Sequence, residues 1–185
     1  MNPLDELNAL TALFPEPEPL IARAEHVPAP ALPRVYRDML AHEYHMTVTM
    51  EDYYKCPVDV KILKRRLEGD IYSREILLLK HGTDQVVQFG IVRLDLRYVT
   101  QQVRDEILSG DTPLGRVLIN HDVLRHIHLG ALLRITVGKP LARYLGIETG
   151  DVTYGRLATI FCNQLPAVDL LEIPAPLEPT NAKLK

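Results

Sequence analysis

Two charged residues, Arg74 and Glu172, occur where the alternating pattern of a strand would place apolar side chains. Arg74 would share one strand face with Ile76 and Leu78, and Glu172 would share a face with Leu170. Burying a charge among apolar groups is costly unless the charge is paired and hydrogen bonded. The two residues are therefore either partly exposed, paired with each other, or the opposite ends of a site for a small polar ligand.

The residue types indicate what such a site would do. A guanidinium fork binds a carboxylate through two parallel hydrogen bonds, so Arg74 would hold an acid. A carboxyl group in an apolar wall keeps its proton more tightly, which would suit Glu172 to donate or exchange a proton. Arg156, in another strand-like stretch, is either a further cation of the site or a surface residue. The stretch Asp111–Arg116 predicts a helix start whose free N–H groups could face an anion, although many helices begin this way.

Other kinds of site find little support in the sequence. His126 and His128 would share a strand face, and His121 lies nearby, but no accompanying carboxylate completes a metal-binding pattern, so no metal site is predicted. There is no Gly-x-Ser-x-Gly elbow and no phosphate-binding glycine motif. Cys162 lies in an apolar run and is interpreted as a small core residue.

The bulk composition also excludes several classes. A chain of 185 residues is long enough for one domain with a substantial core, and its 46% hydrophobic and 24% charged residues are ordinary for a globular protein. A formal net charge of −3 predicts no nucleic-acid partner. No apolar run approaches the roughly 18 residues of a spanning helix, so no membrane association is expected. The start lacks a secretory pattern and two lone cysteines fit a reducing compartment, so the expected location is cytoplasmic.

The elements that would position these residues are mostly strands. The apolar and β-branched patterns predict strands at 46–50, 58–64, 71–80, 85–96, 129–137, 153–162 and 167–173, and helices at 5–14, 34–42, 100–109, 111–118 and 140–145. Adjacent strands with helices grouped elsewhere predict an α+β single domain with a mostly antiparallel sheet. Three segments are expected: a proline-rich amino-terminal arm over 1–30, the domain over 31–174, and a disordered tail over 175–185.

Several stretches together resemble the chorismate lyase-like family. The matching pieces are, in order, Thr47–Met50, Tyr72–Leu78, Thr112–Arg116, Tyr154–Arg156 and Leu170–Ile173. No single piece is specific, but their order and approximate spacing agree over most of the chain. The segment between Arg116 and Arg156 is longer than in the best-known bacterial lyases, and it is more similar to the uncharacterised bacterial and archaeal branch of the family.

The resemblance implies an internal ligand site under helical flaps, with a role for each matching residue. Arg74 would bind the ligand carboxylate, and Leu114 would offer it a backbone contact. Glu172 would meet the hydroxyl end of the product, Met50 would line the pocket, and Arg156 would bind a second carboxylate. Arg74 and Glu172 would be the catalytic pair.

The activity implied by the resemblance is a cofactor-independent lyase that eliminates pyruvate from chorismate to give 4-hydroxybenzoate, as in ubiquinone biosynthesis. Elimination makes the ring aromatic, so the protein need only hold the carboxylates, exclude water and assist one proton movement. The alternatives are a non-catalytic binding protein or sensor for an aromatic acid, and an enzyme making another hydroxybenzoate from a carboxyvinyl ether. The expected partner is a small aromatic carboxylate, and the amino-terminal arm could pack against a neighbouring subunit.

Overall fold

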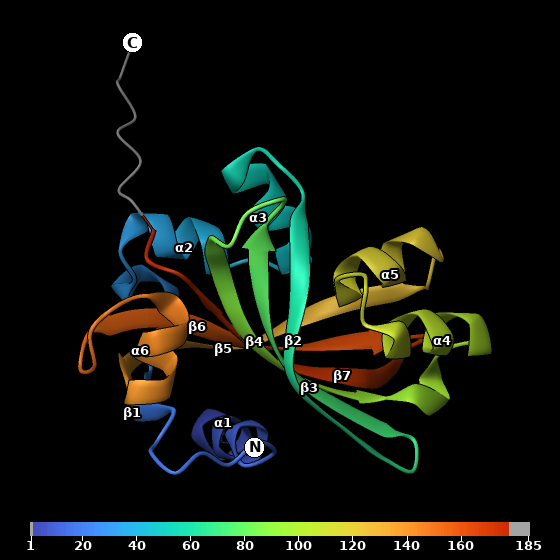
Figure 1. Cartoon of the computed structure of the whole chain (residues 1–185), viewed down its shortest axis with the longest axis horizontal. Coiled ribbons are helices and arrows are strands. Elements are labelled where there is room, and N and C mark those ends of the chain that lie inside the picture. Colours follow the sequence, from blue (N-terminus) through green and yellow to red (C-terminus); the bar gives the residue numbers. More distant parts are fainter. Residues whose placement is uncertain (1, 178–185) are drawn as a thin grey trace.

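The structure, a computed structural model, describes residues 2–177 and is built around one antiparallel sheet (Figure 1). The strands are β1 (Ile21–His26), β2 (Val58–Glu68), β3 (Ile71–Lys80), β4 (Val86–Asp95), β5 (Arg125–Val137), β6 (Val152–Cys162) and β7 (Leu165–Pro174). Their order in the sheet is β1-β5-β6-β7-β4-β3-β2, and every neighbouring pair is antiparallel. The predicted α+β single domain is therefore confirmed.

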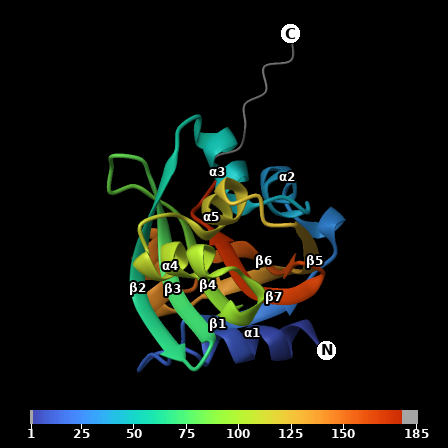
Figure 2. The ribbon, with the colours of Figure 1, turned by 90° about the vertical axis from the view of Figure 1, so that its right-hand side faces the viewer.

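Within the described residues, six α-helices cover the two faces of this sheet (Figures 1 and 2). They are α1 (Pro3–Thr11), α2 (Arg34–Leu40), α3 (Met46–Tyr54), α4 (Gln101–Ser109), α5 (Leu114–Asn120) and α6 (Lys139–Leu145), with short 3-10 turns η1 (Ala29–Ala31) and η2 (Leu96–Tyr98). One face packs against α1 and α6 in a single apolar cluster. The other face carries two clusters, one under α2 and α3 and one under α4 and α5.

Helix α4 shows how local sequence sets an element boundary. The side chain of Thr100 accepts a hydrogen bond from the backbone N–H of Val103 at the start of the helix. Gly110 ends the helix in the left-handed region at φ 80°, where a side chain would be strained. Val103 and Ile107 lie one turn apart and are both buried. The helix predicted at 100–109 is therefore present, with a cap, a stop and an apolar face that its own residues supply.

The strand predicted at 46–50 is wrong, because these residues begin α3. Thr47, Val48 and Thr49 are β-branched and favour a strand locally. In the structure, Met46, Thr47 and Met50 are buried on one side of the helix, where the methionines pack in the cluster under α2 and α3. Tertiary packing of a helical face therefore outweighs the local strand propensity.

The two ends of the described chain lie against the same core. Leu7 and Leu10 of α1 are buried on the first face of the sheet, and β1 pairs with β5 at the sheet edge. Ala175 and Leu177 are also buried, whereas residues 178–185 of the expected tail lie outside the described residues. Within residues 2–177, no helix has the length and apolar character needed to cross a membrane.

Candidate ligand-binding cavity

A cavity lies on the second face of the sheet, between the two helix pairs. The space inside it that the centres of water molecules could occupy is about 40 Å³. Its floor comes mainly from β3, β4, β6 and β7, with Ile127 added by β5, and its cover comes from the start of α3 and the start of α5. The lining residues are His45, Met46, Thr47, Arg74, Ile76, Leu78, Gln88, Gly90, Val92, Pro113, Leu114, Gly115, Ile127, Arg156, Ile160, Leu170, Leu171 and Glu172.

Strand register explains the floor. Ile76, Gly90, Glu172 and Arg156 lie side by side across the four strands, so they form one row on the same face. Gly90 stands at the middle of this row and has no side chain. A Cβ atom there would lie 3.4 Å from Cγ1 of Ile76. The missing side chain therefore leaves the floor open between a hydrophobic edge and a charged edge.

Arg156 is fully buried, and each of its three guanidinium nitrogens donates a hydrogen bond within the protein. Its Nε donates to Oε2 of Glu172 at 2.7 Å. Its Nη1 donates to the backbone oxygen of His42 at 2.9 Å, and its Nη2 donates to the backbone oxygen of Tyr44 at 3.0 Å. This one side chain therefore joins β7 to the loop between α2 and α3, and it has no free donor pair for a ligand carboxylate.

Arg74 is buried to the same degree but is bonded differently. Arg74 is 1% exposed, and neither its Nε nor its Nη1 has a hydrogen-bond partner among residues 2–177. Burial lowers the pKa of the Arg74 guanidinium, and the hydroxyl of Tyr72 on the same strand acts in the opposite direction, although an arginine remains charged in proteins. The cavity thus contains a buried cation with donors to spare.

Gln88 is the second polar group of the floor whose hydrogen bonding is incomplete. It is 2% exposed, and its Oε1 has no hydrogen-bond partner in the described part of the chain. It lies opposite Leu78 of β3 and opposite Pro174 of β7. An unsatisfied buried amide is expensive, so this group is expected to meet a partner that enters the cavity.

The cover is made where α3 and α5 approach each other. A Cβ atom at Gly115 would lie 2.9 Å from Oγ1 of Thr47 and 3.2 Å from Nδ1 of His45, so a side chain there would force Thr47 or His45 to move. Nε2 of His45 accepts a hydrogen bond from Nε of Arg125 at 2.8 Å. Burial, together with nearby arginines of which Arg125 contributes most, lowers the pKa of His45 to about 4. The imidazole is therefore neutral at pH 7, and it contributes no charge to the site.

The structure brings together four of the five residues that the sequence singles out. Arg74, Leu114, Arg156 and Glu172 all line the cavity. Met50 is fully buried in α3 but is not among the lining residues. Of the pairings that the sequence leaves open, the observed one joins Glu172 to Arg156, not to Arg74.

Sequence reasoning missed Gln88, Gly90 and His45. Gln88 and Gly90 did carry a signal, because they alternate with Val92 and Leu94 on the apolar face of β4 and interrupt it with an amide and a gap. His45 carried no such signal, since its position depends on the close approach of α3 and α5.

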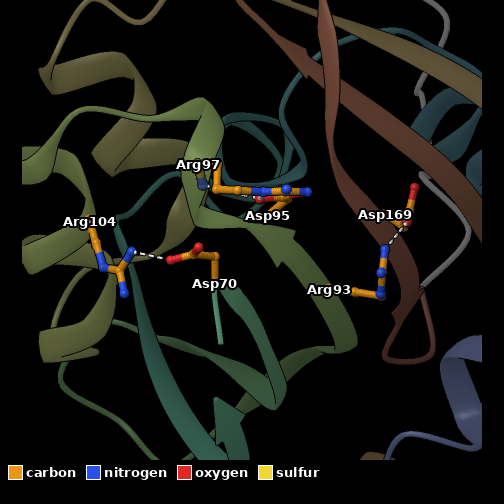
Figure 3. A network of polar contacts seen from close by, with 6 residues as sticks. All are labelled: Asp70, Arg93, Asp95, Arg97, Arg104 and Asp169. Carbon is orange, nitrogen blue, oxygen red and sulfur yellow. Dashed lines mark hydrogen bonds and ion pairs between the residues drawn. The ribbon is translucent and has the colours of Figure 1, made fainter. Parts of the chain in front are cut away.

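A separate group of ion pairs lies near η2 and on the strands outside the cavity (Figure 3). The figure shows three pairs: Asp95 with Arg97, Asp70 with Arg104, and Arg93 with Asp169. Their shortest N–O distances are 2.6, 2.8 and 3.3 Å, and each pair includes a side chain that is more than 40% exposed. Exposed pairs contribute little to stability, and none of these residues lines the cavity. Residues 2–177 also contain no group of three or more side chains placed to hold a metal ion.

Comparison with known proteins finds likeness in structure but not in sequence. No protein-family model matches the chain, and no curated protein matches it. The effector domain of PhnF from Mycobacterium smegmatis aligns with a TM-score of 0.52 at 10% identity, covering 71% of this chain and 88% of that domain. Longer PhnF aligns with a TM-score of 0.50 at 10% identity and the same coverage of this chain, which spans 63% of that protein. A GntR-family transcriptional regulator from Enterococcus faecalis aligns with a TM-score of 0.44 at 14% identity, covering 65% of this chain and 99% of that one.

These likenesses correct three predictions. The neighbours are ligand-binding domains of transcriptional regulators, which share the chorismate lyase-like fold without being lyases, so assignment to the lyase family is wrong. The prediction of an enzyme is wrong for the same reason. The prediction that nucleic acid plays no part is also contradicted, because the neighbours include proteins named as transcriptional regulators, and this chain resembles only their ligand-binding part. At this level of identity, the likeness establishes the fold: that of a regulator effector domain.

Proposed function

We propose that this chain is a ligand-binding sensor domain that holds a small organic acid in its cavity without transforming it. The observation that carries the proposal is Arg74, a buried cation that lines the cavity and has two unpartnered N–H donors. A buried charge without a partner is strongly unfavourable. A ligand carboxylate would relieve this cost by accepting a charge-assisted hydrogen bond from one of these two nitrogens.

The walls favour an acid with an apolar body. Ile76, Val92, Ile160 and Leu170 line the cavity beside Arg74. Apolar walls with a few convergent polar groups are typical of small-molecule sites. An aromatic or alicyclic carboxylic acid combines the charge that Arg74 requires with the flat apolar surface that the walls would bury.

The other residues singled out by the sequence take supporting roles in this proposal. Leu114 begins α5 at the cavity edge and would contact the ligand through its backbone or side chain. Glu172, held by Arg156, would present its carboxylate at the cavity wall. Met50 would support α3 from the core. Contact with DNA would be made by a companion domain, since the net charge of −3 offers no basic surface for phosphates.

The test is a binding titration of the purified chain with benzoate, 4-hydroxybenzoate and cyclohexanecarboxylate, followed by calorimetry and thermal unfolding. A ligand at 100 times its Kd adds about 2.7 kcal/mol to the free energy of unfolding, which raises Tm by about 5–10 °C for a chain of this size. Arg74→Met should abolish this shift, whereas Arg97→Met, at an exposed arginine, should keep it. A shift that survives in Arg74→Met would overturn the proposal.

A further inference from the structure

The segment between α1 and β1 lies against the face of the sheet opposite the cavity. Phe14 and Leu20, at its two ends, are each 8% exposed and belong to the apolar cluster with α1 and α6. A Cβ atom at Gly138 would lie 1.8 Å from the backbone oxygen of Pro19, so the segment passes directly over this glycine. Three of the five residues between these ends are prolines, which have no N–H to donate to the sheet. Side chains must therefore hold residues 15–19, which we call the strap.

Glu16 attaches the strap to the sheet through a side chain of β2. Nζ of Lys64 donates a hydrogen bond to Oε1 of Glu16, and the hydroxyl of Tyr144 on α6 donates to the same oxygen at 3.4 Å. The side chain of Glu16 is only 15% exposed. Its neighbour Glu18 pairs with Lys139 at 3.0 Å, but both of these side chains are at least half exposed. Exposed pairs contribute little, so Glu16 is the main polar attachment of the strap.

Lys64 has a second carboxyl group within reach. Glu75 lies opposite Lys64 in the register of β2 and β3, so both side chains are on the strap's face of the sheet. Glu75 is 0% exposed, its Oε1 lies 3.6 Å from Nζ of Lys64, and neither of its oxygens has a hydrogen-bond partner among residues 2–177. The strap adds Glu16 to this cluster, α6 adds Tyr144 and Arg143, and β4 places an apolar residue opposite Glu75. One ammonium group thus lies between a bonded carboxylate and an unbonded carboxyl.

The two carboxyl groups ionise in a fixed order as the pH rises. The hydrogen bond from Lys64 lowers the pKa of Glu16 below its usual 4.5, whereas burial raises the pKa of Glu75 above 4.5. Between these two pKa values Lys64 faces one carboxylate, and above both it faces two. A buried carboxylate without a partner is costly, and two like charges in one cluster repel each other. The charge on Glu75 therefore works against the contact between Lys64 and Glu16.

We propose that residues 15–19 are a releasable strap, closed while Lys64 serves Glu16 alone and opened when ionised Glu75 competes for Lys64. Glu75 is enclosed by the sheet and cannot turn toward water, so the ammonium moves toward it. Glu16 belongs to a segment with few backbone donors, so it is the carboxylate that leaves for solvent. This device lies on the other face of the sheet from Arg74, and it needs no ligand in the cavity.

The test is NMR relaxation of the backbone amides of Glu16 and Glu18 in the isotope-labelled chain, recorded in steps from pH 4.5 to about pH 8. The order parameters are expected to be about 0.85 at the lower end and to fall below about 0.6 at the upper end. Glu75→Gln, which cannot ionise, should keep the strap rigid at every pH. The matched control is Glu18→Gln, which removes only the exposed pair with Lys139 and should reproduce the change seen in the wild type.

Lys64→Met provides a second test, which decides the matter if circular dichroism shows that Glu75→Gln does not fold. Without the shared ammonium, Glu16 has no cation to hold it, and the strap should be mobile across the whole range. A rigid strap in Lys64→Met overturns the proposal. A wild-type strap whose order parameters do not change with pH also overturns it, and so does a change with pH that persists in Glu75→Gln.

Discussion

Arg74 and Arg156 lie on the same face of the sheet, line the same cavity and are almost equally buried, at 1% and 0% exposure. Arg156 uses all three guanidinium nitrogens within the protein, on Glu172 and on two backbone oxygens of the loop before α3. Arg74 leaves Nε and Nη1 without a hydrogen-bond partner among residues 2–177. Two side chains of the same type in the same cavity are therefore suited to different tasks, one to hold the fold and the other to meet a ligand.

The comparison shows that burial alone does not identify a binding residue. The cost of burying a charge is offset for Arg156 when the chain folds, so this cost gives no reason to expect a ligand there. For Arg74 the same cost remains after folding. The state of the donors, and not the depth of the side chain, separates a structural arginine from one that is ready to bind.

The largest expected effect is on the stability of Arg156→Met. This change leaves the carboxylate of Glu172 without its partner and frees the loop that carries His42 and Tyr44. Removing one member of a buried pair costs about 3–5 kcal/mol in the free energy of unfolding, which urea denaturation measures. The control, Arg93→Met, removes an exposed pair with Asp169 and should change stability by less than about 1 kcal/mol. Equal losses in the two variants would contradict a structural role for Arg156.

The opposite pattern is expected for Arg74→Met. Replacing an unpaired buried charge with an apolar side chain of similar length should leave the free energy of unfolding unchanged or raise it. Binding of benzoate-type acids should weaken by about a hundredfold, the equivalent of losing one charge-assisted hydrogen bond to the carboxylate. Calorimetry and urea denaturation on the same sample measure the two effects. A stability loss as large as that of Arg156→Met would erase the distinction between the two arginines.

A smaller effect is expected from His45, which stands between the cavity and the loop that Arg156 holds. Its pKa is lowered to about 4, so the folded protein binds this proton less readily than the unfolded chain does. The stability that follows is present above pH 6.5 and is lost as the pH falls from 6.5 toward 4. His45→Gln should remove that part of the pH dependence. The measurement is the difference in unfolding free energy between wild type and variant across this range, and a flat difference would contradict the low pKa.

The smallest effect concerns Glu75, the neighbour of Arg74 on the opposite face of β3. Both of its oxygens lack a hydrogen-bond partner among the described residues, although Nζ of Lys64 lies 3.6 Å from Oε1. Burial raises the pKa of this carboxyl above its usual 4.5. The stability that this shift contributes is present below pH 4.5 and is lost as the pH rises through the folded pKa.

Glu75→Gln should therefore gain stability relative to the wild type as the pH rises through this window. Acid titration followed by circular dichroism measures the difference. Glu18→Gln, at an exposed glutamate, serves as the control. The opposite result would be a stability advantage of Glu75→Gln over the wild type that shrinks as the pH rises. It would show that Lys64 keeps the Glu75 carboxylate charged and offsets the cost of burying it, as Glu172 does for Arg156.

The sequence by itself determined most of the elements that carry the site. Period-two patterns place β3, β4, β6 and β7, and the Thr100 cap with Gly110 sets the limits of α4, because these signals arise from contacts between near neighbours. The same periodicity shows that Arg74 and Glu172 point toward apolar faces. The resemblance of short sequence segments to the chorismate lyase-like family predicted the fold better than the activity, since segments that preserve a fold can persist when the chemistry differs.

Only the tertiary structure decided which buried charged side chains pair with each other. Pairing of Glu172 with Arg156 follows from the register of β6 and β7, which are joined through long-range contacts that no local pattern specifies. The helix at Met46–Tyr54 forms because its buried face packs in the apolar cluster under α2 and α3, against the strand propensity of its own residues. Gln88 and Gly90 matter because the sheet sets them between Arg74 and the far side of one cavity. The sequence thus places a charge on an apolar face, and the fold determines whether that charge has already found its counterpart.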